Sequence, residues 1–101
     1  MKCDGHIFFE TLGTKLKIDI IESLREEPLP VNELAKKCNE ERSKVSHALL
    51  SLSQCGFVVA RKDGQKRLYS LNKETLVPLL DLVEAHVKKY CRACTKIKRR
   101  N

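Results

Sequence analysis

The chain has 101 residues, of which 42% are hydrophobic and 33% charged, a balance that fits one folded domain and excludes a disordered chain. It contains no apolar run of about 18 residues and no signal-peptide-like segment near the N-terminus, so we expect a cytoplasmic protein with no membrane partner. The formal net charge is +7, and the excess lies after residue 87, where seven basic residues occur without an acid.

The N-terminal third of the chain predicts two helices. A short apolar segment over residues 7–12 indicates a helix that ends at Gly13. Thr14 can cap a second helix over residues 14–27, because apolar residues recur there at the spacing of one helical face. The two prolines that follow end this helix, since a proline lacks the N–H that a helix interior needs.

Two more helices follow, at a separation typical of a helix-turn-helix. Apolar side chains over residues 31–38 lie at the i, i+3, i+4 and i+7 positions, which predicts a two-turn helix with Cys38 as a small core residue. A turn then leads to a helix from about Arg42 to Gln54. Gly56 fits the left-handed position that follows the end of that helix.

The period then changes from that of a helix to that of a strand. Residues 57–61 and 65–71 are β-type runs, and Asp63-Gly64 between them is a strong hairpin signal. The order of elements is therefore four helices, a hairpin and one helix. We predict a mainly α, α+β fold: a winged helix-turn-helix of about five helices with a two-stranded β-hairpin wing.

The last predicted helix follows Asn72, which can cap it. Pro78 is tolerable only in a first turn, so the regular helix is expected to begin near Thr75. We expect residues 1–90 to form the folded domain and residues 91–101 to form a basic tail that contains cysteine. Such a tail favours polyanions, above all nucleic acid; a solvated end that only aids solubility is the alternative.

Three stretches of the sequence resemble the ArsR-type winged-helix regulators of transcription. They are LGTKLKIDIIESL over residues 12–24, the pattern VNELA…SKVSHAL…L…GFV over residues 31–58, and the wing-like residues 61–71. The resemblance covers about residues 7–90. It implies a transcriptional repressor that acts as a homodimer and binds an imperfect palindrome in double-stranded DNA.

The resemblance places the helix over residues 42–54 in the major groove and the wing over residues 61–67 on the flanking backbone. The polar residues near the start of this helix lie off its apolar face, where they can contact bases or phosphates. The alternatives are a solvated helix face and, for the wing cations, protection of a strand edge. The predicted DNA-binding residues are Arg42, Ser43, Lys44, Ser46, His47, Arg61, Lys62, Lys66 and Arg67.

The resemblance also implies that the first and last helices pair two copies of the chain. The apolar residues of those two helices are the candidates for that contact. The predicted interface residues are Phe8, Phe9, Leu79, Leu80, Val83 and Val87.

Many ArsR-type proteins sense metals, but two of the places where the family holds its ligands lack them here. The start of the third helix, residues 30–32, has no cysteine. The last helix offers Asp81, Glu84 and His86, but Asp81 and His86 are five residues apart, a poor spacing for one helical face.

Cys91 and Cys94 are the remaining candidates for an effector site. At i and i+3 on a helix their thiolates share a face and could bind zinc or another soft metal, with Cys3 or a partner chain supplying more ligands. The neighbouring cations would lower the thiol pKa values and favour a redox switch. A pair of thiols with no sensing role is the alternative.

The sequence contains no catalytic signature. No Gly-rich phosphate loop and no supported Ser/His/Asp arrangement occurs, so we do not expect an enzyme. The alternative to a DNA-binding regulator is a winged-helix module that docks on another protein without specific DNA binding, because a fold alone does not decide function. The basic wing and tail favour DNA, whereas the acidic Glu40-Glu41 pair mildly favours the docking module.

Overall fold

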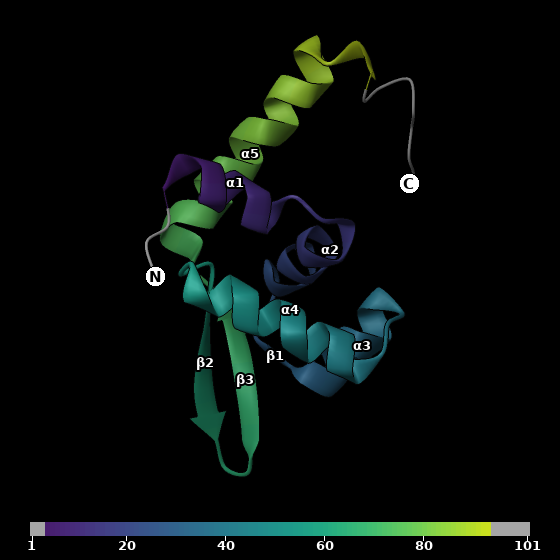
Figure 1. Ribbon diagram of the computed structural model, residues 1–101, viewed down its shortest axis with the longest axis vertical. Helices are drawn as coiled ribbons and strands as arrows, with labels where there is room; N and C mark the ends of the chain where they lie inside the picture. The colour runs from purple at the N-terminus through teal and green to yellow at the C-terminus, as the bar shows by residue number, and fades with distance from the viewer. Residues whose placement is uncertain (1–3, 94–101) are drawn as a thin grey trace.

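The computed structural model describes residues 4–93, which form a winged helix-turn-helix of five helices and a three-stranded antiparallel sheet (Figure 1). This is the predicted fold class. The helices are α1 (Gly5–Leu12), α2 (Lys15–Leu24), α3 (Val31–Cys38), α4 (Arg42–Gln54) and α5 (Lys73–Tyr90), and the strands are β1 (Leu29–Pro30), β2 (Val58–Asp63) and β3 (Lys66–Leu71).

The helix-turn-helix consists of α3, α4 and the turn between them. The turn begins at Asn39, whose φ of 55° is left-handed, a conformation that asparagine tolerates better than most residues. The bounds of α4 are those predicted, and Gly56 follows its end with φ 77°. The residues beside its two ends therefore determine where α4 begins and ends.

A single apolar core holds the helices and the sheet together. It takes side chains from every helix and from the inner end of the hairpin, and Phe57 is its largest fully buried member. Phe8 of α1 meets Phe57 edge to face, with ring centroids 4.8 Å apart. Burying a side chain of this size contributes about 2–3 kcal/mol, so Phe57 anchors α1 on the start of β2.

The β2–β3 hairpin, called the wing below, pairs Val58 with Leu71 at its base and Asp63 with Lys66 at its tip. The turn residues are therefore Gly64 and Gln65, one position later than the predicted Asp63-Gly64. Gly64 has φ 66°, which suits the first central residue of such a turn. The third strand, β1, was not predicted, because two residues, one of them a proline, carry no strand period.

Two helix ends differ from the prediction. The second helix ends at Leu24, three residues before the predicted end, and α5 begins at Lys73 and not near Thr75. Pro78 therefore lies inside α5, where burial of Leu76 and Leu80 in the core outweighs the cost of the proline. Thr14 caps α2 as predicted, since its Oγ1 accepts from the Lys17 N–H at 3.2 Å.

The N-terminal end of α5 was expected to be capped by Asn72. Asn72 does stand at the N-cap position, but its side chain makes no capping hydrogen bond. Its Nδ2 donates instead to the Gly56 carbonyl oxygen at 2.9 Å. Asn72 therefore ties the end of the wing to the end of α4 and leaves the start of α5 without a side-chain cap.

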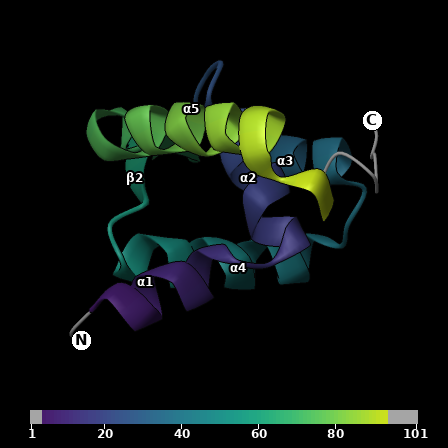
Figure 2. The same cartoon turned by 90° about the horizontal axis from the view of Figure 1, so that it is seen from above.

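The arrangement places α4 and α5 on opposite sides of α2 (Figure 2). The wing and the C-terminal half of α5 project from opposite ends of the body (Figure 1). Among residues 4–93, no helix has the length and hydropathy needed to cross a membrane. The fold thus presents two separate projecting features, the wing and α5.

Candidate nucleic-acid interface

The N-terminal half of α4 presents the polar residues that the sequence singled out. Val45, Ala48, Leu49 and Leu52 are buried, and they define the inner face of the helix. The remaining positions of the first turns face solvent because they lie off that inner stripe. The exposed residues are Arg42, Ser43, Lys44, Ser46 and His47.

A hollow of about 440 Å³ joins one edge of α4 to the wing. Arg42 and Ser46 line it from α4, and Lys66 and Arg67 line it from β3. The structure therefore brings four of the nine predicted DNA-binding residues together, from segments about 20 residues apart in the sequence. A hollow with three cations on its walls is suited to a polyanion.

The register of the wing divides its cations between two faces. Residues directly opposite each other in an antiparallel pair project to the same side, so Lys62 lies beside Arg67. Like charges in this position destabilise a hairpin unless an anion lies between them. Arg61 pairs with Leu68 on the other face of the wing, so it points away from Arg67.

A second hollow, of about 400 Å³, lies along the other edge of the exposed face of α4. Ser43, Lys44 and His47 line it from α4, and Thr14 and Lys17 line it from α2. The exposed face of α4 is therefore flanked by one hollow toward the wing and another toward α2.

The acidic pair before α4 is partly neutralised. Glu40 lies 3.8 Å from the Lys44 Nζ, one helical turn further on. Glu41 is the N-cap residue, but its side chain accepts no capping hydrogen bond, which leaves the first N–H groups of α4 without a side-chain partner. The two carboxylates therefore lie beside the candidate surface, and they do not occupy the N–H groups at the start of α4.

Several lining residues were missed from the sequence. Asn32 at the start of α3, Gln65 in the turn and Tyr69 on β3 line the wing-side hollow, and Thr14 and Lys17 line the other. Lys17 is only one of several polar residues on the outer side of its helix, and no local signal separates it from Lys15. Only the packing of α2 against α4, across about 30 residues of sequence, shows the difference.

A second exposed surface is apolar and lies on α1 and α5. Phe9 is 64% exposed, Leu82 69% and Val83 46%. A cavity of about 180 Å³ between the two helices is lined by Phe9, Leu79 and Val83, among others. Exposed apolar area of this kind on a small domain is typical of a protein contact.

The residues predicted for dimer contact divide into two groups. Phe9 and Val83 are exposed, whereas Leu80 is 6% exposed and belongs to the core of its own chain. Phe8 and Leu79 are partly buried against that core, and Val87 is half-buried. Leu80 lines the α1–α5 cavity but is mainly buried in the core of its own chain. The exposed Leu82 was missed because it lies beside the apolar stripe that marks the core face.

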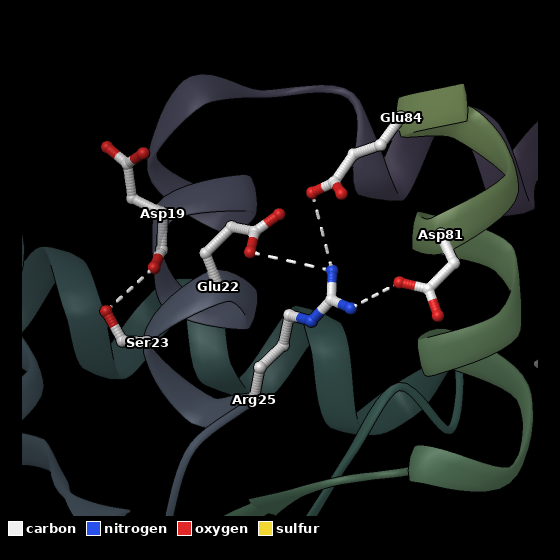
Figure 3. A network of polar contacts seen from close by, with 6 residues as sticks. All are labelled: Asp19, Glu22, Ser23, Arg25, Asp81 and Glu84. Carbon is white, nitrogen blue, oxygen red and sulfur yellow. Dashed lines mark hydrogen bonds and ion pairs between the residues drawn. The ribbon is translucent and has the colours of Figure 1, made fainter. Parts of the chain in front are cut away.

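An ion-pair network fixes α5 against the end of α2 (Figure 3). The Arg25 guanidinium donates to the Asp81 carboxylate at 2.6 Å and lies 3.6 Å from Glu84 and 3.8 Å from Glu22. The hydrogen bond to Asp81 is the main cause that raises the pKa of Arg25 above its ordinary value. Asp81 and Glu84, considered above as metal ligands, are thus engaged by a cation of their own chain.

The cysteines supply no complete metal site in the described region. Cys3 and Cys94 lie outside the described residues, and Cys91 is half-buried just after α5. Within residues 4–93 no group of three or more His, Cys, Asp or Glu side chains could hold a metal ion. The zinc or thiol switch stays a prediction. Cys38 is half-buried against the core, and burial raises the pKa of its thiol.

Known proteins match this chain over the same elements. A sequence profile of the IclR helix-turn-helix domain matches residues 18–62, from inside α2 to β2. The HTH-type transcriptional regulator NmtR of Mycobacterium tuberculosis is 39% identical over 72 residues, which are 71% of this chain and 60% of NmtR. This chain thus spans less than two thirds of that relative.

Two solved structures share the fold. The crystal structure of Mycobacterium tuberculosis Rv0081 has a TM-score of 0.77 and 32% identity, covering 81% of this chain and 83% of that one. The homodimeric winged helix-turn-helix domain of Mb0332 from Mycobacterium bovis, described as a possible ArsR-family regulator, has a TM-score of 0.75 and 20% identity, covering 90% and 82%. Rv0081 is named an uncharacterized HTH-type transcriptional regulator.

These matches agree with the fold. The chain therefore shares the winged helix-turn-helix fold, and relatives that match it in sequence are named HTH-type transcriptional regulators. The IclR profile leaves α1, β3 and all of α5 outside the match, so it covers most of α2, the helix-turn-helix and the first wing strand.

Proposed function

We propose that this protein is a sequence-specific, double-stranded DNA-binding repressor of the ArsR type, acts as a homodimer in the cytoplasm and has no enzymatic activity. The observation that carries the proposal is the wing-side hollow, where Arg42 and Ser46 of α4 meet Lys66 and Arg67 of the wing. A helix that can enter the major groove and a cationic hairpin beside it form one continuous surface. The ArsR type is favoured over the IclR type because the chain resembles the former in its first helices and its wing.

In the proposed complex, the exposed face of α4 lies in the major groove. Ser46 and His47 are within the first two turns, where a recognition helix contacts base edges. Arg42, Lys62 and Arg67 would neutralise phosphates beside them, and the anion would relieve the repulsion between Lys62 and Arg67. Contacts to bases then set the sequence preference, and contacts to phosphates set the register and most of the affinity.

The homodimer is proposed to form through the apolar surface of α1 and α5. Exposed Phe9, Leu82 and Val83 would be covered by the same surface of a second copy, as a twofold interface requires. The homodimeric state of the Mb0332 domain supports this choice of occupant. A twofold dimer would place two copies of α4 on an imperfect palindrome, with half-sites about one helical turn apart.

The alternative, a docking module for another protein, rested on the acidic pair before α4. Because Glu40 lies near Lys44, the pair contributes less negative charge to the surface than the sequence indicates. Lys66 of the wing-side hollow stands opposite Asp63, and Glu33 lies at the α3 edge, but Arg42 and Arg67 make no ion pair among the described residues. The balance of charge therefore favours DNA.

The test is a titration of the purified, reduced protein against its own upstream DNA and a scrambled duplex, at two salt concentrations. We expect binding to the upstream duplex to be tighter by at least 10³-fold, the lower end for specific over non-specific DNA binding. Equal, weak binding to both duplexes that salt abolishes would contradict the proposal. Repeating the titration after oxidation and with Zn²⁺ tests the switch proposed for Cys91 and Cys94.

A further inference from the structure

The hollow on the α2 side of α4 is lined by two lysines, of which Lys44 lies 3.8 Å from Glu40. Its seven lining residues include two lysines and no carboxylate; Thr14, Leu16 and Lys17 come from α2, and Ser43, Lys44, His47 and Ala48 come from α4. Its volume of about 400 Å³ is close to that of the wing-side hollow. Of its lining residues, Ala48 is buried.

Lys17 is held in place at this hollow by packing and by one hydrogen bond. Its Nζ donates to the Ser51 Oγ of α4 at 3.1 Å, and the side chain is half-buried. The ammonium has two further protons to donate. Within the described residues Lys17 makes no ion pair, whereas Lys15 two positions earlier is bonded to Asp19 at 2.9 Å. Lys17 thus holds an uncompensated, oriented charge.

The positions of the two hollows follow from the geometry of α4. Successive helical residues are about 100° apart, so Arg42 and Ser46 mark one border of the exposed face, and Lys44 marks the other. Ser43 and His47 lie between these borders. A helix in the major groove lies between two phosphate backbones, about 12 Å apart across the groove. Each hollow faces one side of that helix.

We propose that the α2–α4 hollow binds a backbone phosphate of duplex DNA, on the strand across the major groove from the wing, with Lys17 as its main cation. This inference rests on the proposed function and adds a second phosphate site to it. The Ser43 and Thr14 hydroxyls can donate to the same phosphate, since the Thr14 oxygen already accepts from the Lys17 N–H. The two sites together fix the depth and tilt of α4 in the groove.

The experiment compares Lys17→Gln with Lys15→Gln in the full chain, using the upstream duplex over a range of salt concentrations. Glutamine keeps a donor for Ser51 and removes the charge, so the contact between α2 and α4 is preserved. Lys15→Gln removes the same charge from the same helix, outside the hollow. Circular dichroism melting checks that both variants fold.

We expect Lys17→Gln to reduce the slope of log K against log salt concentration by about 0.9 for each protomer bound, and the affinity at 0.1 M salt by about tenfold. Lys15→Gln should leave the slope within error of the unsubstituted protein, and Lys17→Arg should restore it. Identical slopes for Lys17→Gln and Lys15→Gln would overturn the inference. If the unsubstituted protein fails to prefer the upstream duplex, the proposed function itself fails, whatever these variants show.

Discussion

The two exposed surfaces of this protein differ in both chemistry and origin. The α4–wing surface is polar and cationic, and it is assembled from segments that are separated in sequence by the end of α4 and the strand β2. The α1–α5 surface is apolar, with Phe9, Leu82 and Val83 exposed, and it comes from the two ends of the folded domain. A cationic surface favours a polyanion through long-range charge, whereas an apolar surface gains free energy when it leaves water.

Salt and apolar substitutions should therefore act on different surfaces of the protein. Binding at the α4–wing surface should weaken steeply as salt rises, because phosphate contacts release counterions. Contact between two α1–α5 surfaces should change little with salt, because it depends on apolar area. A substitution on one surface should therefore change the property of that surface, either DNA binding or dimerisation, and leave the other property unchanged.

The largest expected effect is that of Val83→Asp on the dimer. A carboxylate at this exposed apolar position would have to be buried without a partner, which costs on the order of 3 kcal/mol or more and raises the dimer dissociation constant over 100-fold. Sedimentation equilibrium measures the change. Val59→Asp is the matched control, since it makes the same substitution at an exposed valine of β2, outside the α1–α5 surface, and should leave the dimer intact. A dimer unchanged by Val83→Asp would refute the interface.

The next effect concerns the two faces of the wing. Arg67→Ala should lower the salt slope by about 0.9 for each protomer bound and weaken binding to all duplexes, because it removes a phosphate contact. Arg61→Ala removes an arginine from the opposite face of the same hairpin, and it should have a smaller effect on the slope. Fluorescence anisotropy over a salt series measures both. Equal slopes for the two variants would contradict a greater role of Arg67 than of Arg61 in phosphate binding.

A smaller effect is expected for base recognition by α4. Ser46→Ala should reduce the ratio of affinities for upstream and scrambled duplexes by about fivefold, corresponding to about 1 kcal/mol at one contact. Ser53→Ala is the control, because the Ser53 hydroxyl donates to the Leu49 carbonyl within the helix and lies away from the hollow. Competition titration with both duplexes gives the ratio. A ratio that falls equally in both variants would place the loss in the stability of α4.

The smallest effect is expected at the turn of the wing. Gly64→Ala places a side chain at φ 66° and should lower the free energy of unfolding by about 1 kcal/mol. Open space surrounds a Cβ at this position, so the cost is conformational and not steric. Urea unfolding measures it, and dimerisation should be unaffected. A decrease of several kcal/mol in the free energy of unfolding would show that Gly64 has a structural role beyond its positive φ.

Local sequence signals predicted most of the fold. Helix periods, Gly56 and the proline positions located the helices within a few residues, since each depends on neighbours along the chain. The two-residue strand β1 was missed because its partner Tyr69 lies 40 residues away and no period forms in two residues. Asn72 was placed at the correct cap position, but its side chain bonds to Gly56, a contact that only the folded chain brings together.

The sequence predicted which residues of the candidate site are exposed, but it did not predict which of them line the same hollow. The exposed cations of α4 and the wing follow from the pattern, because the buried stripe of α4 fixes which positions face outward. The pairing of Arg42 with Arg67 in one hollow, and of Lys17 with the Ser43 side of α4, depends on tertiary packing. The burial of Leu80 and the exposure of Leu82 could not be separated from the sequence, because neighbouring apolar stripes of α5 face the core and the solvent.

The most direct test of the account is a titration of ¹⁵N-labelled protein with the upstream duplex, followed by amide chemical shifts. The account predicts that the largest changes occur at residues 42–47 and 63–67, with smaller changes near Lys17 and none centred on Phe9 or Val83. Changes confined to the basic residues after Tyr90, with α4 and the wing unaffected, would contradict it, because DNA would then contact the tail by charge alone.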